Sequence, residues 1–154
     1  MINFAVAEMK DLETLREISL KAFRDDLKKY GALPPGIDSI EWHISKIERG
    51  IYYKILVDDM IAGGINLYDL GDGHFCLGAI FISPEYQSQG IGSKAIEFIE
   101  KKYDHVKRWT LDTPYLNTGN HRFYEKHGYR KVDEIQPQKD VEFYLYIYEK
   151  QMDE

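Results

Sequence analysis

A strand that stops at a proline, followed by a glycine-rich turn and an amphipathic helix, constrains this chain more than any other feature. Residues 80–82 are apolar, Pro84 ends the run, and Gly90 and Gly92 open a helix. A helix that begins this way points its free N–H groups, with the positive end of its dipole, at whatever lies above it. The stretch 80–95 therefore predicts an anion site, most simply one for a phosphate.

Glycine suits this interpretation at both positions, since a Cβ on Gly90 or Gly92 would keep a pyrophosphate from lying against the backbone. A lone Gly-x-Gly also occurs in ordinary strand-to-helix turns, so the motif needs support from the rest of the chain. A dinucleotide-binding fingerprint is excluded, because a third glycine is missing and several strands precede the motif.

Composition limits the class of protein. A length of 154 residues indicates one domain, 1–154, and 44% apolar with 30% charged residues is typical of a globular chain. The net charge of −6 argues against binding to a nucleic-acid backbone. Cys76 is the only cysteine, and no signal peptide or apolar run of about 20 residues is present. We expect a soluble, cytoplasmic protein that binds neither nucleic acid nor membrane.

Hydrophobic periodicity predicts the element order β-α-α-β-β-β-α-β-α-β-β. Asp11 stands where it can cap the first helix, which extends toward Tyr30, and Asp38 or Ser39 can cap the second. Gly31 and the run 34–36 break the chain between these two helices. The expected strands are 2–6, 52–57, 60–70, 74–82, 108–112, 129–132 and 141–148, and the expected helices are 12–30, 40–47, 91–103 and 117–127.

The strand–helix–strand unit over residues 76–112 implies a parallel pair of strands inside an otherwise antiparallel sheet. No internal repeat, low-complexity segment or linker interrupts the chain. The fold class is therefore α+β, in a single domain.

Two motifs in these positions resemble the GCN5-related N-acetyltransferase (GNAT) superfamily. The first is Ile82-Ser83-Pro84 with Gln87-Ser88-Gln89-Gly90-Ile91-Gly92, similar to the family pattern Gln/Arg-x-x-Gly-x-Gly/Ala after an apolar-x-Pro step. The second runs from Asn117 to Tyr129 and ends Tyr124-Glu125-Lys126-His127-Gly128-Tyr129, similar to the family's Tyr-Glu-Lys-x-Gly-Phe/Tyr. The resemblance implies a mixed central sheet of about seven strands with a splayed parallel pair, flanked by about four helices.

The resemblance also implies acetyl-CoA as acyl donor, and no metal. The pyrophosphate is expected on backbone N–H groups of residues 87–92, and the pantetheine arm along the main chain of Phe81 and Ile82. The family's asparagine aligns with Asn120, which we favour, or with Asn117, according to the spacing counted back from the tyrosine. The expected donor-binding residues are Phe81, Ile82, Gln87, Ser88, Gln89, Gly90, Ile91, Gly92, Ser93, Asn117 and Asn120.

Tyr124 is the expected catalytic residue, because it matches the family's tyrosine. A thiolate leaving group has a pKa near ~8.5, judged from cysteine, whereas tyrosine titrates near ~10, so full proton transfer is uphill by ~2 kcal/mol. We therefore expect Tyr124 to stabilise the departing thiolate chiefly by a hydrogen bond.

The reaction also needs a neutral amine and a donor for the developing oxyanion. A lysine-like amine with a pKa of ~10.4 is mostly protonated at pH 7, so the site must desolvate it or remove its proton. A backbone N–H of the strand 74–82 is the expected oxyanion donor. The ionisable candidates for the base are Asp112, Glu85, Asp69, His74 and His43, and the sequence singles out none of them.

The acceptor pocket is expected between the first two helices, the hairpin at 69–73 and the loop after Val132, with Tyr30, Trp42 and Tyr68 as possible lining residues. The acidic charge favours a small amine or short peptide that attacks the donor directly in a ternary complex. Acetylation of a protein N-terminus or lysine and a non-catalytic acyl-CoA-binding module are the alternatives. A homodimer is common in the family, and the sequence neither supports nor excludes one.

Overall fold

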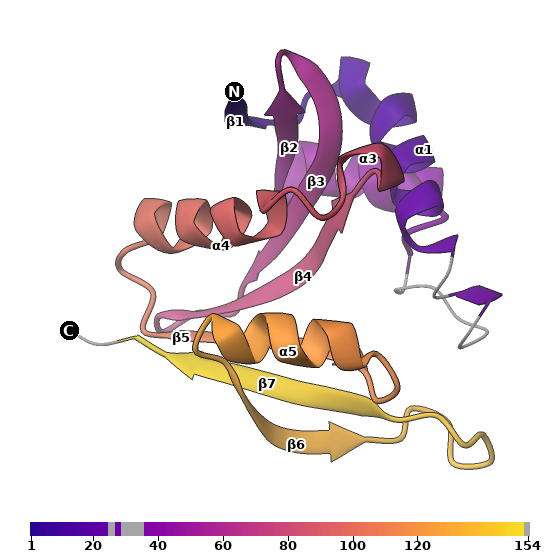
Figure 1. Ribbon diagram of the computed structural model, residues 1–154, viewed down its shortest axis with the longest axis vertical. Coiled ribbons are helices and arrows are strands. Elements are labelled where there is room, and N and C mark those ends of the chain that lie inside the picture. The colour runs from indigo at the N-terminus through magenta and orange to yellow at the C-terminus, as the bar shows by residue number, and fades with distance from the viewer. Residues whose placement is uncertain (25–26, 29–35, 153–154) are drawn as a thin grey trace.

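Seven strands form one sheet in the order β1-β2-β3-β4-β5-β7-β6 (Figure 1). The computed structural model describes residues 1–24, 27–28 and 36–152. Within these residues β4 and β5 are the single parallel pair, and every other pair of neighbours is antiparallel, which confirms the predicted fold class. The strands are β1 (Ile2–Val6), β2 (Ile51–Val57), β3 (Met60–Asp69), β4 (His74–Ile82), β5 (Arg108–Pro114), β6 (Arg130–Ile135) and β7 (Leu145–Gln151).

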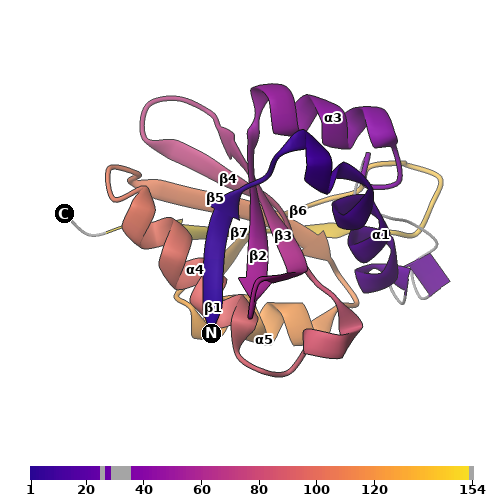
Figure 2. The same cartoon turned by 90° about the horizontal axis from the view of Figure 1, so that it is seen from above.

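Helices cover both faces of the sheet (Figure 2). Tyr53 and Ile55 of β2 belong to the larger core, under α4, whereas Tyr52 belongs to a smaller core with α1, because side chains alternate along a strand. The helices are α1 (Leu12–Ala22), α3 (Ile40–Arg49), α4 (Ile91–Lys102) and α5 (Thr118–Lys126), with 3-10 turns η1 (Met9–Asp11) and η2 (Pro84–Tyr86). None of these described helices has the length and apolar character needed to cross a membrane.

Asp11 begins the first helix as expected, but its side chain does not cap it. The carboxylate instead accepts the N–H of Glu8 at 2.9 Å and the ammonium of Lys54 at 2.9 Å. Burial alone would raise the pKa of Asp11, but these two donors outweigh burial and lower it. The carboxylate therefore ties the start of α1 to β2.

The second helix begins at its predicted cap. The hydroxyl of Ser39, and not a side-chain oxygen of Asp38, accepts the N–H of Trp42, and Gly50 follows the last turn. The expectations for Tyr30, Gly31 and residues 34–35 lie outside the described residues.

The last two strands begin and end later than periodicity predicted, at 130–135 and 145–151 instead of 129–132 and 141–148. Every residue of β6 is exposed, so the strand has no apolar–polar alternation to reveal its length. Val132 also interrupts its register with β7, since Lys131 pairs with Tyr148 and Asp133 with Ile147.

The parallel pair separates soon after it begins. β4 and β5 pair only at His74–Arg108, Phe75–Trp109 and Cys76–Thr110, and the remaining residues of both strands diverge (Figure 1). A bulge in β4 follows at once: Ala79 lies opposite Asn66 and Leu77 opposite Leu67, so Gly78 is the extra residue. The splayed pair is thus confirmed, and the bulge that accompanies it is a feature that the sequence did not reveal.

Glycine is needed at the bulge because a side chain has no room there. A Cβ on Gly78 would lie 2.3 Å from Cε2 of Tyr68 and 2.8 Å from Oδ1 of Asn66. The bulge re-aims the end of β4 away from β5 and opens the sheet on the side where α4 begins.

Candidate functional site

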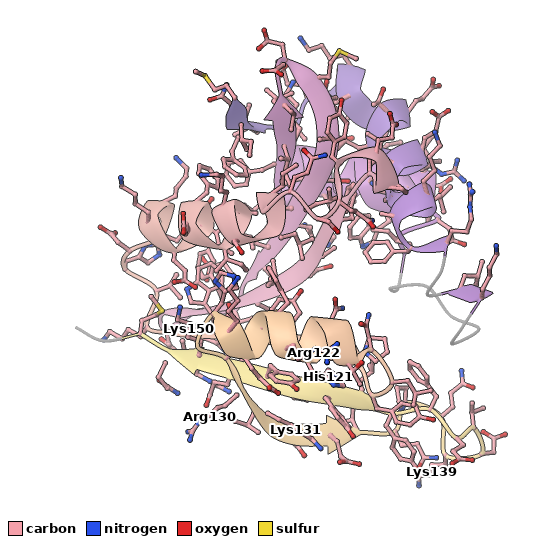
Figure 3. All side chains as sticks on the ribbon, viewed as in Figure 1. His121, Arg122, Arg130, Lys131, Lys139 and Lys150 are labelled. Atoms are coloured by element: carbon pink, nitrogen blue, oxygen red, sulfur yellow. The ribbon has the colours of Figure 1, made fainter. Side chains whose placement is uncertain are left out.

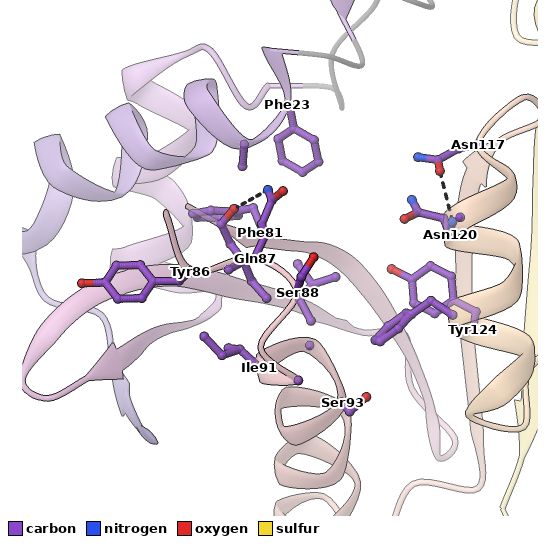
Figure 4. Close-up of a pocket in the computed structure, with 17 residues that line it drawn as sticks. Phe23, Phe81, Tyr86, Gln87, Ser88, Ile91, Ser93, Asn117, Asn120 and Tyr124 are labelled. Atoms are coloured by element: carbon purple, nitrogen blue, oxygen red, sulfur yellow. Dashed lines mark hydrogen bonds between the residues drawn. The ribbon is translucent and has the colours of Figure 1, made fainter. Parts of the chain in front are cut away.

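The splayed strands open onto a cavity of about 600 Å³. Five separate parts of the chain line it: the end of α1, the end of β4, the turn after β4, the start of α4 and one face of α5 (Figure 4). A cavity of this size is in the range that holds small-molecule ligands and cofactors. The start of α4, where the sequence predicts an anion site, forms part of its lining.

The turn before α4 presents unpaired backbone N–H groups to this cavity. Ser88 and Gly90 both adopt left-handed backbone conformations, with φ of 63° and 78°. Gly90 is the N-cap of α4, so the N–H groups of Ile91, Gly92 and Ser93 have no partner within the helix. Successive N–H groups at the start of a 12-residue helix, backed by its dipole, make a site for an anion.

The two glycines of this turn have different physical roles. An added Cβ at Gly90 would meet no atom within 4 Å, but the φ of 78° disfavours any side chain there. At Gly92 a Cβ would come within 3.1 Å of Cζ of Phe123. Gly92 therefore allows α4 to pack against α5, while the space above Gly90 is open. That a Cβ at either position would hinder a pyrophosphate stays a prediction.

The end of β4 has one edge free of the sheet. Ser83 donates its N–H to Ala62 of β3 at 2.7 Å, so by strand alternation the main-chain groups of Ile82 face the opposite way. The carbonyl oxygen of Ile82 accepts Nε2 of Gln87 at 2.9 Å, as the dashed line in Figure 4 marks. The carbonyl oxygen of Phe81 faces Gly63 of β3, so Phe81 contributes its side chain, and not this carbonyl, to the cavity.

Asn117 and Asn120 lie on the opposite wall, at the start of α5 (Figure 4). Asn117 is the N-cap, and its Oδ1 accepts the N–H of Asn120 at 3.1 Å. The side-chain amide of Asn120 donates to Oγ1 of Thr113 on β5 at 3.2 Å. Both residues line the cavity, and each also has a structural contact that holds α5 in place.

Tyr124 lies one turn further along α5 and is 7% exposed. Its ring packs between Phe123 and Tyr129, and its hydroxyl points into the cavity (Figure 4). Burial, and to a smaller extent the negative charge of Asp112, raises the pKa of Tyr124 above its ordinary value. The phenol is therefore protonated at neutral pH and is available as a hydrogen-bond donor.

Comparison with known proteins decides the family. A model of the acetyltransferase (GNAT) family matches residues 12–129, about three quarters of the chain. The chain belongs to the GNAT acetyltransferase family. This confirms the resemblance that the two sequence motifs suggested.

Solved structures of GNAT proteins have the same fold. The PaiA N-acetyltransferase of Thermoplasma acidophilum, in complex with coenzyme A, superposes with a TM-score of 0.83 at 21% identity, covering 99% of both chains. The ribosomal-protein alanine N-acetyltransferase of Escherichia coli gives a TM-score of 0.79 at 20% identity, covering 98% of this chain and 94% of the other. The Bacillus subtilis protein YrkN is 36% identical over 85 residues, which are 54% of this chain and 46% of YrkN, so the match spans under half of that relative.

The GNAT fold brings together nearly all of the residues that the sequence suggested for donor binding and catalysis. The exception is Gln89, whose side chain is exposed and reaches back to the carbonyl of Glu85 at 3.4 Å. The sequence missed Ala22 and Phe23, which come from the end of α1. It also missed Phe123, although its position beside Tyr124 in the second motif was a usable signal.

The two histidines among the candidate bases are occupied by other contacts. His43 is fully buried, with Nδ1 3.0 Å from the hydroxyl of Tyr52 and Nε2 2.8 Å from the carbonyl of Ile37. Burial lowers the pKa of His43, so the ring is a neutral structural bridge. His74 has Nε2 2.8 Å from Oγ1 of Thr110, and burial lowers its pKa as well.

The three acidic candidates lie in different surroundings, and none of them is among the residues that line the cavity. Asp69 accepts the N–H of Gly71 in the β3–β4 turn, and Glu85 is exposed within η2. Asp112 lies on the diverging part of β5. Solvent reaches its side chain, but the surrounding protein partly desolvates the carboxyl and thereby raises its pKa. It is also the charge that acts on Tyr124.

The face of the sheet toward α3 carries the aromatic residues expected near an acceptor. The ammonium of Lys46 lies over the ring of Tyr68, 4.5 Å from its centroid, and 5.8 Å from that of Trp42. This part of the protein already holds a cation against two aromatic rings. Tyr30 lies outside the described residues.

The C-terminal part of this acidic protein carries basic and acidic side chains in equal number. The basic ones labelled in Figure 3 come from α5, β6, β7 and the loop between the two strands: His121, Arg122, Arg130, Lys131, Lys139 and Lys150. Two of these cations are already paired, Lys131 with Glu134 at 2.9 Å and Lys150 with Glu100 at 2.8 Å.

Proposed function

We propose that the protein transfers an acetyl group from acetyl-CoA to a primary amine of a small molecule or short peptide. The proposal depends on one observation: the N–H groups at the start of α4 and the hydroxyl of Tyr124 line the same cavity from opposite sides (Figure 4). The first group suits an anionic pyrophosphate, and the second suits a sulfur that gains negative charge.

The residues present fit this donor. The unpaired N–H groups of residues 91–93 suit its phosphates. The main-chain groups at the free edge of β4, at Ile82, can form hydrogen bonds with the amides of a pantetheine arm, as they would with a neighbouring strand. Coenzyme A bound to the Thermoplasma protein of the same fold, and acetyl-CoA bound to a Bacillus anthracis acetyltransferase with a TM-score of 0.62 at 19% identity, covering 68% of this chain and 63% of the other, support this choice of donor.

When bound, acetyl-CoA supplies a thioester carbon that a neutral amine can attack, so that a C–N bond forms, the C–S bond breaks and a thiol is released. The protein must first hold the amine without its extra proton. We propose Asp112 for that role, because it lies on β5 just beyond the last residue paired with β4 and its charge acts on Tyr124; since it does not line the cavity itself, the proton would reach it through a water molecule. Its raised pKa brings this carboxylate closer to the working pH than an exposed aspartate.

Tyr124 acts on the leaving group. Its Oη–H donates a hydrogen bond toward the position of the sulfur, where charge develops as the thiolate departs. Because burial raises the pKa of Tyr124 further above that of a thiol, full proton transfer is more unfavourable than solution values indicate. Hydrogen-bond stabilisation of the thiolate is therefore its main contribution, with the proton delivered as charge builds.

The diverging edge of β4 supplies the hydrogen-bond donor for the oxyanion. Beyond Cys76 the strand no longer pairs with β5, and the bulge at Gly78 turns its main chain toward the opening. A backbone N–H on this edge, already held in place by the β3 side of the strand, can stabilise the developing oxyanion without reorganising.

An amine panel tests the proposal. Purified protein is incubated with acetyl-CoA and small amines, short peptides or intact proteins, while free thiol and the mass of the products are followed. We expect thiol release that depends on an amine and a product heavier by one acetyl group. Tight binding of acetyl-CoA in calorimetry with no amine-dependent thiol release would instead support a non-catalytic acyl-CoA-binding module.

A further inference from the structure

One hydrogen bond joins the two walls of the donor cavity. Oγ of Ser93, in the first turn of α4, lies 2.9 Å from Nε2 of His127, the residue at which α5 ends. Ser93 lines the cavity, whereas His127 lies behind it and packs against Phe123, with ring centroids 4.8 Å apart. The histidine therefore touches no ligand but determines which way the serine hydroxyl can point.

The direction of this hydrogen bond matters for an anion. If Ser93 donates its O–H to Nε2 of His127, the oxygen lone pairs of the serine are left facing the cavity and repel a phosphate. If Nε2–H of His127 donates to Oγ instead, the serine hydroxyl is free to donate into the cavity. A protonated imidazole carries hydrogens on both nitrogens and permits only the second arrangement.

We propose that His127 is a positioning residue that turns the Ser93 hydroxyl toward the pyrophosphate of the donor, and that it thereby couples donor binding to its own protonation. This inference depends on the proposed function, since it assumes that the anion at the start of α4 is the pyrophosphate of a coenzyme A derivative. It concerns the one polar side chain of the helix start that a second element controls.

The charges around His127 have both signs. Glu97 and Glu100 of α4 favour its protonated form, while Lys126 of α5 and Lys150 of β7 oppose it. Lys150 is itself paired with Glu100 at 2.8 Å. Burial is the largest effect and, with the two lysines, lowers the pKa of His127, so that the free protein holds a neutral ring at neutral pH.

The sign of the coupling follows from these directions. Because the anion favours the protonated ring, the pKa of His127 is higher in the complex than in the free protein, and binding takes up protons. Donor affinity should therefore rise as the pH falls from neutral toward the pKa of the free protein, and should level off below it. A tenfold change in affinity corresponds to one unit of difference between the two pKa values.

Dephospho-CoA is the suitable probe, because it lacks the 3′-phosphate, whose second pKa near ~6 would titrate in the same range. Titration calorimetry from about pH 5 to about pH 8 should show affinity for the wild type rising several-fold toward the acid end, with proton uptake when two buffers of different ionisation enthalpy are compared. Thermal melting of each variant checks that it is folded.

Four variants separate positioning from packing. Ser93→Ala should bind about tenfold more weakly at neutral pH with a flat pH profile, since a hydrogen bond to a charged group is lost. His127→Phe leaves the Ser93 hydroxyl without this partner and should lose the pH dependence while binding more tightly than Ser93→Ala, and the double variant should bind as weakly as Ser93→Ala alone. His127→Asn, which can donate at every pH, should keep the affinity and lose the pH dependence. His105→Asn, a change in an exposed residue beyond the C-terminal end of α4, should behave as the wild type.

If His127→Asn keeps the pH dependence of affinity that the wild type shows, the coupling is overturned. A Ser93→Ala variant that binds as tightly as the wild type overturns it as well. Either result would leave the proposed function intact, because the protein would still bind the probe. No binding of dephospho-CoA or of acetyl-CoA to the folded wild type at any pH would overturn the proposed function and this inference together.

Discussion

Nε2 of Gln87 donates to the carbonyl oxygen of Ile82 across 2.9 Å, so the turn that carries the proposed anion site is fastened to the free edge of β4. Both parts of the proposed donor site, the free edge of β4 and the N–H groups at the start of α4, thus depend on one side chain. A carbonyl oxygen has two lone pairs, so Ile82 can accept from Gln87 and still face a ligand.

Gln87→Ala should weaken the binding of acetyl-CoA several-fold, because the turn loses the hydrogen bond that holds it against β4. Gln89→Ala, two residues further on with its side chain outside the cavity, is the matched control and should bind as the wild type. Calorimetry measures both. Tighter binding by Gln87→Ala would mean that the glutamine blocks the strand edge instead of supporting the turn.

Gly90→Ala should lose much of its affinity for acetyl-CoA. The φ of 78° costs an alanine roughly 1–2 kcal/mol, and its methyl group enters the open space above the helix start. Gly71→Ala provides the comparison, since Gly71 has a φ of 88° and an equally open surrounding in the β3–β4 turn. The two variants should lose similar stability in chemical denaturation. Equal affinities would contradict the placement of the pyrophosphate.

Tyr124→Phe should fold and bind acetyl-CoA normally while turnover falls by about 100-fold or more, the range for loss of a positioned proton donor. The hydroxyl points into the cavity, so its removal leaves the packing of the ring intact. Tyr129→Phe is the control, because the Tyr129 hydroxyl is buried without a partner in the described residues and its removal should not lower stability. Wild-type turnover in Tyr124→Phe would remove this residue from the mechanism.

Asp112→Asn should lower turnover at neutral pH and abolish the acid limb of the kcat/KM profile. The same substitution should not lower the stability of the fold. Burial raises the folded-state pKa of Asp112 above its unfolded value, so the ionised carboxylate at neutral pH opposes folding, and this penalty disappears as the pH falls below the folded-state pKa. The neutral amide should therefore leave the melting temperature unchanged or raised. An activity loss accompanied by destabilisation would indicate a structural role instead.

Asp11→Asn should destabilise the protein by about 2 kcal/mol, because it removes the nearer of two carboxylates beside the buried ammonium of Lys54 and leaves that of Glu8 at 3.6 Å. The pKa of Asp11 is lowered on folding, so its contribution is present above the unfolded value of 3.8 and is lost as the pH falls through the folded-state pKa. Denaturation between neutral and acid pH should show a wild-type loss of stability that Asp11→Asn lacks. Parallel pH profiles of the two proteins would contradict this assignment.

The sequence by itself was sufficient for the order of the elements, the parallel pair and the glycine turn that begins α4, because these depend on local features: apolar periodicity, Pro84, and the glycines at 90 and 92. It also placed Tyr124 and the asparagines of α5 in the site through a motif of contiguous residues. Local signals failed at β6, where an exposed edge strand carries no periodicity.

Tertiary structure alone decided how these segments meet. The bulge at Gly78 and the end of pairing after Cys76 depend on what lies opposite each residue, which a single strand does not encode. The wall formed by Phe23 and the contact of Ser93 with His127 join segments far apart in the chain. The sequence therefore indicated the turn that we propose binds the donor, and packing between α4, α5 and the diverging strands determined the cavity that this turn lines.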